Sequence, residues 1–126
     1  MAFGTIFDVI ASTDKGDLSI KLTYSYSDIL PSEIQFELIL GTSNSQSTSK
    51  FRGDITNPAV TANLSINDVI SDPFALCLMA CVGGVVIKPI AECFNKDVKR
   101  YVHCLKSKGL AISGEVIACA IECAAK

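Results

Sequence analysis

All six cysteines of this 126-residue chain fall within its last fifty residues: Cys77, Cys81, Cys93, Cys104, Cys119 and Cys123. An even number of cysteines in one short segment is typical of a disulfide framework. Disulfides persist in oxidising compartments, so the pattern predicts a secreted or periplasmic protein with three intramolecular disulfides and no free thiol. The opening residues lack the basic and apolar regions of a signal peptide, so we expect a mature form with an added methionine or another export route.

Charge divides the chain at the same place as the cysteines. Residues 1–70 carry eight acidic and four basic side chains, whereas residues 71–126 carry five acidic and seven basic ones. We therefore expect an acidic lobe at 1–70 and a basic, cysteine-rich lobe at 71–126, packed together as one unit. The whole chain has a net charge of −2, which leaves no surplus of positive charge for a phosphate backbone and argues against nucleic-acid binding.

The first lobe has the apolar alternation of an antiparallel sheet. Alternating apolar and polar residues at 17–26 and 33–40 predict two strands, each with one buried face. Residues 5–11 and 59–66 predict further strands, and the polar tract at 41–49 predicts a connecting loop. We expect roughly four or five strands in a small antiparallel sheet or a sandwich.

Two short motifs in this lobe each have a functional and a structural interpretation. Arg52-Gly53-Asp54 is the tripeptide that adhesion receptors of the integrin class recognise, but a turn at a strand end produces the same letters. Asn63-Leu64-Ser65 is a glycosylation sequon inside a predicted strand. In both cases the structural interpretation is the simpler one.

The second lobe changes from strand to helix periodicity. Asp72 and Pro73 are typical of an N-cap and a first helical position, and Gly83, Gly84 and Pro89 are expected to weaken, kink or end the helix that follows. A double glycine also ends the leader of many exported peptides, although helix flexibility or close packing explains it more simply. The uncharged run at 74–87 would be about 21 Å long as a helix, too short to span about 30 Å of hydrocarbon.

Two further helices are predicted, from Asn95 to Ser107 and from Ser113 onward. The first of them is amphipathic and cationic. Its apolar positions are Val98, Tyr101, Val102 and Leu105, and its basic positions are Lys96, Lys99, Arg100 and Lys106.

The spacing of the cysteines favours one pairing. Cys77 and Cys81 share one helix face, as do Cys119 and Cys123, because residues four apart lie one above the other. Antiparallel helices would bring Cys77 to Cys123 and Cys81 to Cys119, leaving Cys93 for Cys104. Six cysteines allow fifteen pairings, and this nested one puts both helical pairs in register.

Other chemistry for these cysteines fits the sequence less well. Structural zinc sites use closely spaced thiolates in turns, whereas both close pairs here have three intervening residues on apolar helices. His103 precedes Cys104, but adjacent helical residues point about 100° apart, so a surface histidine is the simpler interpretation than a thiolate–imidazolium pair. We expect no metal and no cofactor.

Six cysteines in helices, a nested pairing and ten residues between Cys93 and Cys104 resemble the saposin-like peptides, whose members bind or perforate lipid. The resemblance covers Cys77–Cys123 only. The outer pairs depart from the usual spacing of that family, and the segment between Cys81 and Cys93 is too short for its additional helix.

The sequence therefore predicts an α+β protein, in which an antiparallel sheet precedes a disulfide-stapled lobe of three helices. The leading functional expectation is a secreted, non-enzymatic, membrane-active defence, antimicrobial or toxin protein whose cationic helices engage anionic lipid. The alternative is a secreted module whose sheet binds a protein or a glycan while the helices complete the core. An enzyme is the third choice, because no nucleophile–base pair stands out. The oligomeric state stays open.

Overall fold

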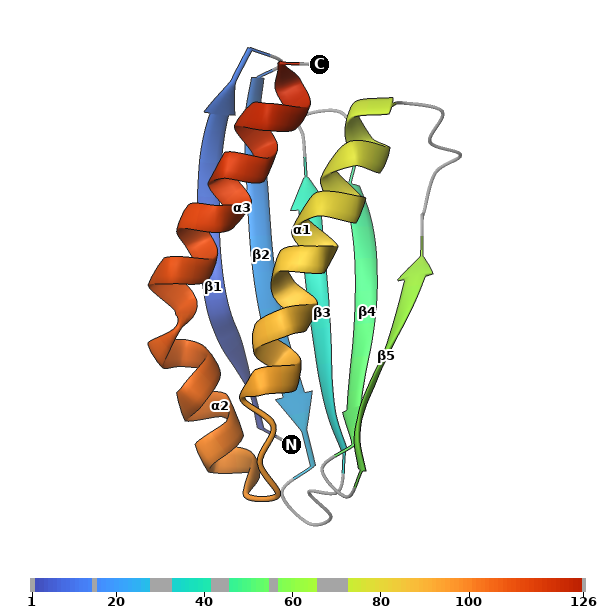
Figure 1. Ribbon diagram of the computed structural model, residues 1–126, viewed down its shortest axis with the longest axis vertical. Helices are drawn as coiled ribbons and strands as arrows, with labels where there is room; N and C mark the ends of the chain where they lie inside the picture. The colour runs from blue at the N-terminus through green and yellow to red at the C-terminus, as the bar shows by residue number, and fades with distance from the viewer. Residues whose placement is uncertain are drawn as a thin grey trace.

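The computed structural model describes residues 2–14, 16–27, 33–41, 46–54, 57–65 and 73–125 (Figure 1). Five strands form one antiparallel sheet in the order of the chain. They are β1 (Ala2–Thr13), β2 (Gly16–Tyr26), β3 (Glu33–Gly41), β4 (Gln46–Asp54) and β5 (Asn57–Ser65). The described strands belong to this one sheet, so the sandwich that the sequence left open is not supported.

The predicted alternation decides which sheet face is buried. Leu18, Ile20 and Leu22 of β2 are buried, as are Ile34, Phe36, Leu38 and Leu40 of β3. In β1 the register with β2 shifts between Thr5 and Phe7, so both Ile6 and Phe7 enter the core. An extra residue of this kind is a β-bulge, which bends its strand and strengthens the local twist.

The polar tract at 41–49 was predicted to be a connecting loop, but part of it lies in strands. Gly41 is the last residue of β3, and residues 46–49 form the first half of β4. Serine and threonine obscure the strand because they provide no apolar alternation for period analysis to detect. Backbone pairing to β3 on one side and β5 on the other defines β4 instead.

Three helices form a second layer on one face of the sheet: α1 (Pro73–Glu92), α2 (Val98–Ser107) and α3 (Gly109–Ala124) (Figure 1). α1 contacts β4 and β5, whereas α2 and α3 contact β1. The α+β class with disulfides is confirmed. Buried residues of the sheet and of all three helices form one hydrophobic cluster, so the acidic and the basic segments share a core.

α1 continues through the residues that were expected to interrupt it. Gly83, Gly84 and Pro89 all lie inside the helix, which ends at Glu92. Tertiary packing outweighs their low helix propensity, because Val82, Val86 and Ile90 are completely buried against the sheet. The expected N-cap, Asp72, lies outside the described residues.

The starts of α2 and α3 also differ from the expected ones. Asp97, not Asn95, is the N-cap of α2, and its side chain accepts a hydrogen bond from the Lys99 amide. α3 begins at Gly109, because Lys108 has helical backbone angles and serves both as C-cap of α2 and as N-cap of α3. Ser113 therefore lies inside α3, where its hydroxyl donates to the Gly109 carbonyl.

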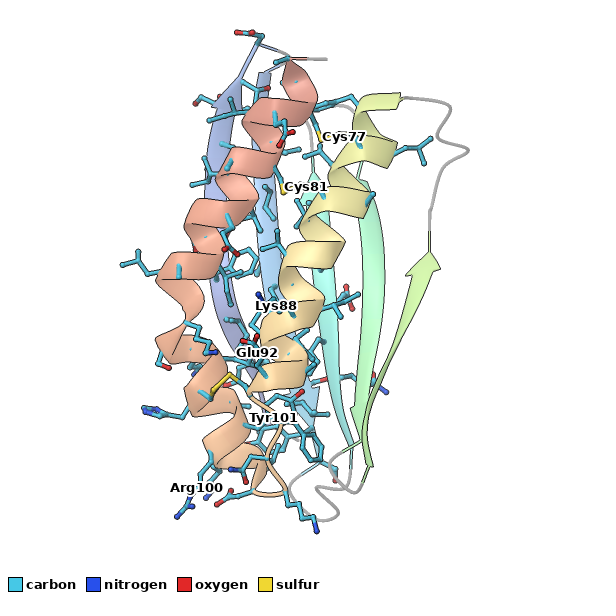
Figure 2. All side chains as sticks on the ribbon, viewed as in Figure 1. Cys77, Cys81, Lys88, Glu92, Arg100 and Tyr101 are labelled. Carbon is cyan, nitrogen blue, oxygen red and sulfur yellow. A yellow bond between two sulfur atoms is a disulfide. The ribbon has the colours of Figure 1, made fainter. Side chains whose placement is uncertain are left out.

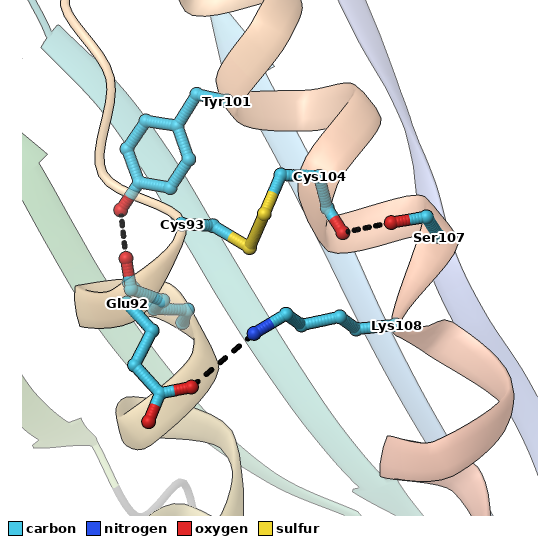
Figure 3. Close-up of a disulfide and its surroundings, with 7 residues drawn as sticks. Glu92, Cys93, Tyr101, Cys104, Ser107 and Lys108 are labelled. Carbon is cyan, nitrogen blue, oxygen red and sulfur yellow. Dashed lines mark hydrogen bonds and ion pairs between the residues drawn. A yellow bond between two sulfur atoms is a disulfide. The ribbon is translucent and has the colours of Figure 1, made fainter.

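Tyr101 of α2 is fully buried where α2, α1 and the sheet meet. Its hydroxyl donates a hydrogen bond to the Ile90 carbonyl near the end of α1 (Figure 3). Its ring packs against Phe36 and Phe94, with centroid separations of 5.7 Å and 6.0 Å. Burial disfavours the charged phenolate and raises the pKa of Tyr101 to about 12.

This pKa predicts a loss of stability in alkali. The folded protein holds the Tyr101 proton more tightly than the unfolded chain does, because the unfolded pKa is near the ordinary value of 10.0. The contribution is complete below that value and is lost as the pH rises toward 12. We expect the free energy of unfolding to fall by about 2–3 kcal/mol across this range, measured by urea unfolding with the disulfides intact.

Tyr101→Phe should remove this pH dependence and cost about 1–2 kcal/mol at neutral pH, because the Ile90 carbonyl loses its donor. Tyr26→Phe is the control for removing a phenol elsewhere. An unchanged alkaline slope in Tyr101→Phe would contradict the assignment.

Candidate functional site

Three disulfides fasten the helical layer. They join Cys77 to Cys123, Cys81 to Cys119 and Cys93 to Cys104, with Cα–Cα distances of 5.8, 5.9 and 5.6 Å. These are the nested pairs that the helical register favours. All six sulfurs are oxidised, which leaves no thiolate for zinc or for a pair with His103. Cys93 is the first residue after α1, so the chain leaves the helix at this disulfide.

α1 and α3 enclose a groove of about 830 Å³ along their seam. The Cys81–Cys119 disulfide lies at one end, and an ion pair between Lys108 Nζ and Glu92 Oε2, 3.2 Å apart, lies toward the other (Figure 3). Lys88 and Glu115 line the stretch between them. Charges of both signs therefore share the groove, which gives it no single-sign field for a charged ligand.

The four predicted basic residues are all exposed at the end of the helical layer formed by α2 and the residues just before it. Lys99, Arg100 and Lys106 lie on α2, and Lys96 lies two residues before it. Figure 2 shows Arg100 at this end of the molecule. The apolar side of α2 is buried: Val98, Tyr101, Val102 and Leu105 all belong to the core. The intact fold thus presents the charges of this amphipathic helix and withholds its apolar side.

Among the side chains that the structure describes, Asp97 forms an ion pair with one of these cations. Asp97 Oδ2 lies 3.7 Å from Nε of Arg100, and both side chains are more than half exposed. An exposed pair of this kind contributes about 0.2–1 kcal/mol and is screened by salt, so Arg100 stays available to another anion. His103 is exposed on the same helix.

An aromatic cluster lies under the basic residues. Tyr24 and Tyr26 of β2 stack with centroids 6.2 Å apart, and Lys106 Nζ lies 5.3 Å from the centroid of Tyr24. Tyr24 is paired in register with Phe36, which contacts Tyr101. All three tyrosines of the chain therefore lie at one end of the molecule. We call this region the basic–aromatic end: Lys96, Lys99, Arg100, Lys106, Tyr24, Tyr26, Phe36, Phe94 and Tyr101.

The sequence predicted the basic residues of this end but not the aromatic cluster beneath them. Tyr24 and Tyr26 were expected only as inward residues of a strand. Gly4, which pairs with Tyr24 in the sheet, is the sequence signal that could have indicated the aromatic cluster, because the Tyr24 ring occupies the space beside this glycine. A Cβ at Gly4 would lie 2.6 Å from the Tyr24 hydroxyl oxygen, so no larger residue fits without moving the ring.

Lysine beside partly buried tyrosine is a combination that suits a boundary between water and an apolar phase. Tyrosine places its ring in the apolar phase and its hydroxyl in water, and lysine extends its charge from an apolar stem. The basic–aromatic end can therefore contact anionic groups at such a boundary.

Other kinds of site find less support in the described part of the chain. Within those ranges, no group of three or more His, Cys, Asp or Glu side chains is placed to hold a metal ion. Among the same residues, no helix combines the length and the apolar character that a bilayer crossing requires.

Comparison with known proteins gives no relative from which a function could be transferred: no protein family, no curated protein and no solved structure matches the chain.

Proposed function

We propose that this is a secreted, non-enzymatic, membrane-active protein of the defence or toxin kind, which attaches to anionic lipid through its basic–aromatic end. The observation that carries the proposal is the exposure of Lys99, Arg100 and Lys106 on a helix whose other side is buried, with exposed Lys96 two residues before that helix. Each cation that reaches an anionic surface contributes about 1 kcal/mol to binding.

The buried apolar side of α2 limits what the folded protein does at a membrane. Val98, Tyr101, Val102 and Leu105 cannot enter hydrocarbon while they fill the core. The first step is therefore electrostatic attachment at the headgroups. Deeper insertion, if it follows, requires the helical layer to separate from the sheet.

The disulfides support the secreted part of the proposal. Three bridges with no free cysteine fit an oxidising compartment, where such bonds persist. Mass spectrometry of the protein purified from its natural source without reduction tests this, and six alkylatable thiols would contradict it.

A second candidate is a module whose sheet binds a protein or a glycan. One observation favours it: the three helices cover one face of the sheet, and the opposite face carries exposed side chains such as Thr5, Asp8 and Gln35 (Figure 1). These polar side chains suit hydrogen bonding to a polar partner, and the exposed Phe3 and Ile10 lie on the same face.

Vesicle experiments separate the two candidates. We expect co-sedimentation with vesicles that contain anionic phosphatidylserine or phosphatidylglycerol and little with pure phosphatidylcholine. Binding should weaken steeply as salt rises, because screening acts on exposed charges. Release of an encapsulated dye from the same vesicles then reports whether attachment leads to permeabilisation. Failure to bind anionic vesicles at low salt would favour the binding module.

A further inference from the structure

We infer that Leu110 is a membrane anchor beside the basic residues, and that it sets the orientation in which the protein attaches. This inference rests on the proposed attachment to anionic lipid. Leu110 is the most exposed of the large hydrophobic side chains that the structure describes, at 89%. It follows Lys106 by four residues, at the junction where α2 ends and α3 begins.

The backbone at this junction is held firmly in place. An added Cβ at Gly109 would lie 3.1 Å from the Ile6 carbonyl oxygen, so the first turn of α3 lies directly against the bulge of β1. Lys108 ties the same junction to α1 through its ion pair with Glu92. Leu110 is therefore presented from a supported position.

The surroundings of Leu110 favour an anionic lipid surface over another partner. The exposed helical residues within four positions of Leu110 are Lys106, Ser107, Ala111 and Gly114, of which one is basic and none is acidic; the exposed Glu115 follows Gly114. An exposed leucine next to cations combines burial of apolar surface with attraction to anionic headgroups, which is how amphipathic segments bind at membrane interfaces. The positive charge of Lys106 beside Leu110 therefore favours an anionic lipid surface as the partner.

The other exposed hydrophobic residues point elsewhere. Leu76 and Ile121 lie on the first part of α1 and the last part of α3, which meet at the end of the molecule away from α2 (Figure 1). Phe3 and Ile10 alternate with the buried residues of β1, and so lie on the sheet face away from the helices. Phe3 pairs with Ser25, between Tyr24 and Tyr26, so it lies at the same end as α2 but on the other face of the sheet. Attachment along the exposed side of α2 brings Leu110 to the lipid and keeps Leu76, Ile10 and Ile121 in water.

The absence of tryptophan from the chain makes this orientation directly testable. Leu110→Trp, Ile121→Trp and Ile10→Trp each introduce one fluorescent reporter at an exposed position. With anionic vesicles, we expect a blue shift and protection from an aqueous quencher for Leu110→Trp only. Brominated acyl chains should quench the same reporter, which places it below the headgroups.

A polar substitution measures the contribution of the side chain. Leu110→Asn should weaken vesicle binding by about tenfold or more, and Ile121→Asn should leave it unchanged. Both side chains are exposed, so the unfolding midpoints of both variants should match that of the parent.

The outcomes distinguish this inference from the proposed function. Binding of the parent protein without a shift at Leu110→Trp would overturn the anchor and leave the electrostatic attachment intact. Equal shifts at all three positions would overturn the single orientation. No binding of the parent at low salt would overturn both.

Discussion

Replacing Lys96, Lys99, Arg100 and Lys106 together by glutamine is expected to weaken binding to anionic vesicles by about 3–4 kcal/mol, or roughly a hundredfold to a thousandfold. The reason is that all four charges are exposed at one end, and among the described side chains the ion pair formed there is the exposed one between Arg100 and Asp97. The fold should stay intact, because α2 is held by its buried apolar side. Vesicle co-sedimentation at several salt concentrations measures the change, and the salt dependence should decrease with it.

A matched variant removes the same number of positive charges elsewhere. Lys15, Lys21, Lys50 and Lys88 to glutamine leaves the protein with the same net charge as the first variant. We expect it to bind vesicles nearly as well as the parent. Equal losses in both variants would mean that net charge alone controls binding, and the assignment to the basic–aromatic end would be wrong.

Replacing Cys81 and Cys119 together by alanine is expected to lower the free energy of unfolding by about 2–3 kcal/mol. The bridge closes a long loop, with a sequence separation of 38, but the Cys77–Cys123 bridge still limits the unfolded chain. Removing this bridge therefore lowers the free energy of unfolding by less than removing an isolated bridge would. Urea unfolding measures the change, and circular dichroism should show that sheet and helix are retained.

Peptide mapping of the unreduced parent protein is the companion measurement. A Cys81–Cys119 peptide is expected. A bond from either residue to Cys93 or Cys104 would rule out the antiparallel register of α1 and α3, and a loss well below 1 kcal/mol in the alanine variant would contradict the stabilising role.

Much of the helical layer was predictable because covalent geometry restricts it. Cysteines four apart on two helices can reach each other in few arrangements, and Cys93 and Cys104 were then left to pair. The boundaries of the helices were less predictable. Gly109 and Pro89 are weak helix formers in isolation, yet α3 begins at Gly109, close to the Ile6 carbonyl, and α1 continues through the buried Pro89.

The basic–aromatic end illustrates a different limit. Lys106 and Tyr24 are far apart in the sequence, and each has an ordinary local explanation, as a solvated helix residue and as an inward strand residue. Their contact depends on how α2 lies over β2, which local periodicity does not encode. The β4 strand was missed for a related reason, because its partners and not its own composition specify it.

The three disulfides all join residues of the helical layer, and none connects that layer to the sheet. Denaturant unfolding with the bridges intact must therefore end in a compact denatured ensemble, in which α1 and α3 remain close together. Such an ensemble exposes less new surface than an unconstrained chain, which lowers the urea m-value for a protein of this length. Because no disulfide holds the helices to the sheet, the two layers can separate while the helices stay joined to one another. The apolar sides of the helices then become free together, as a unit that the three disulfides keep tied.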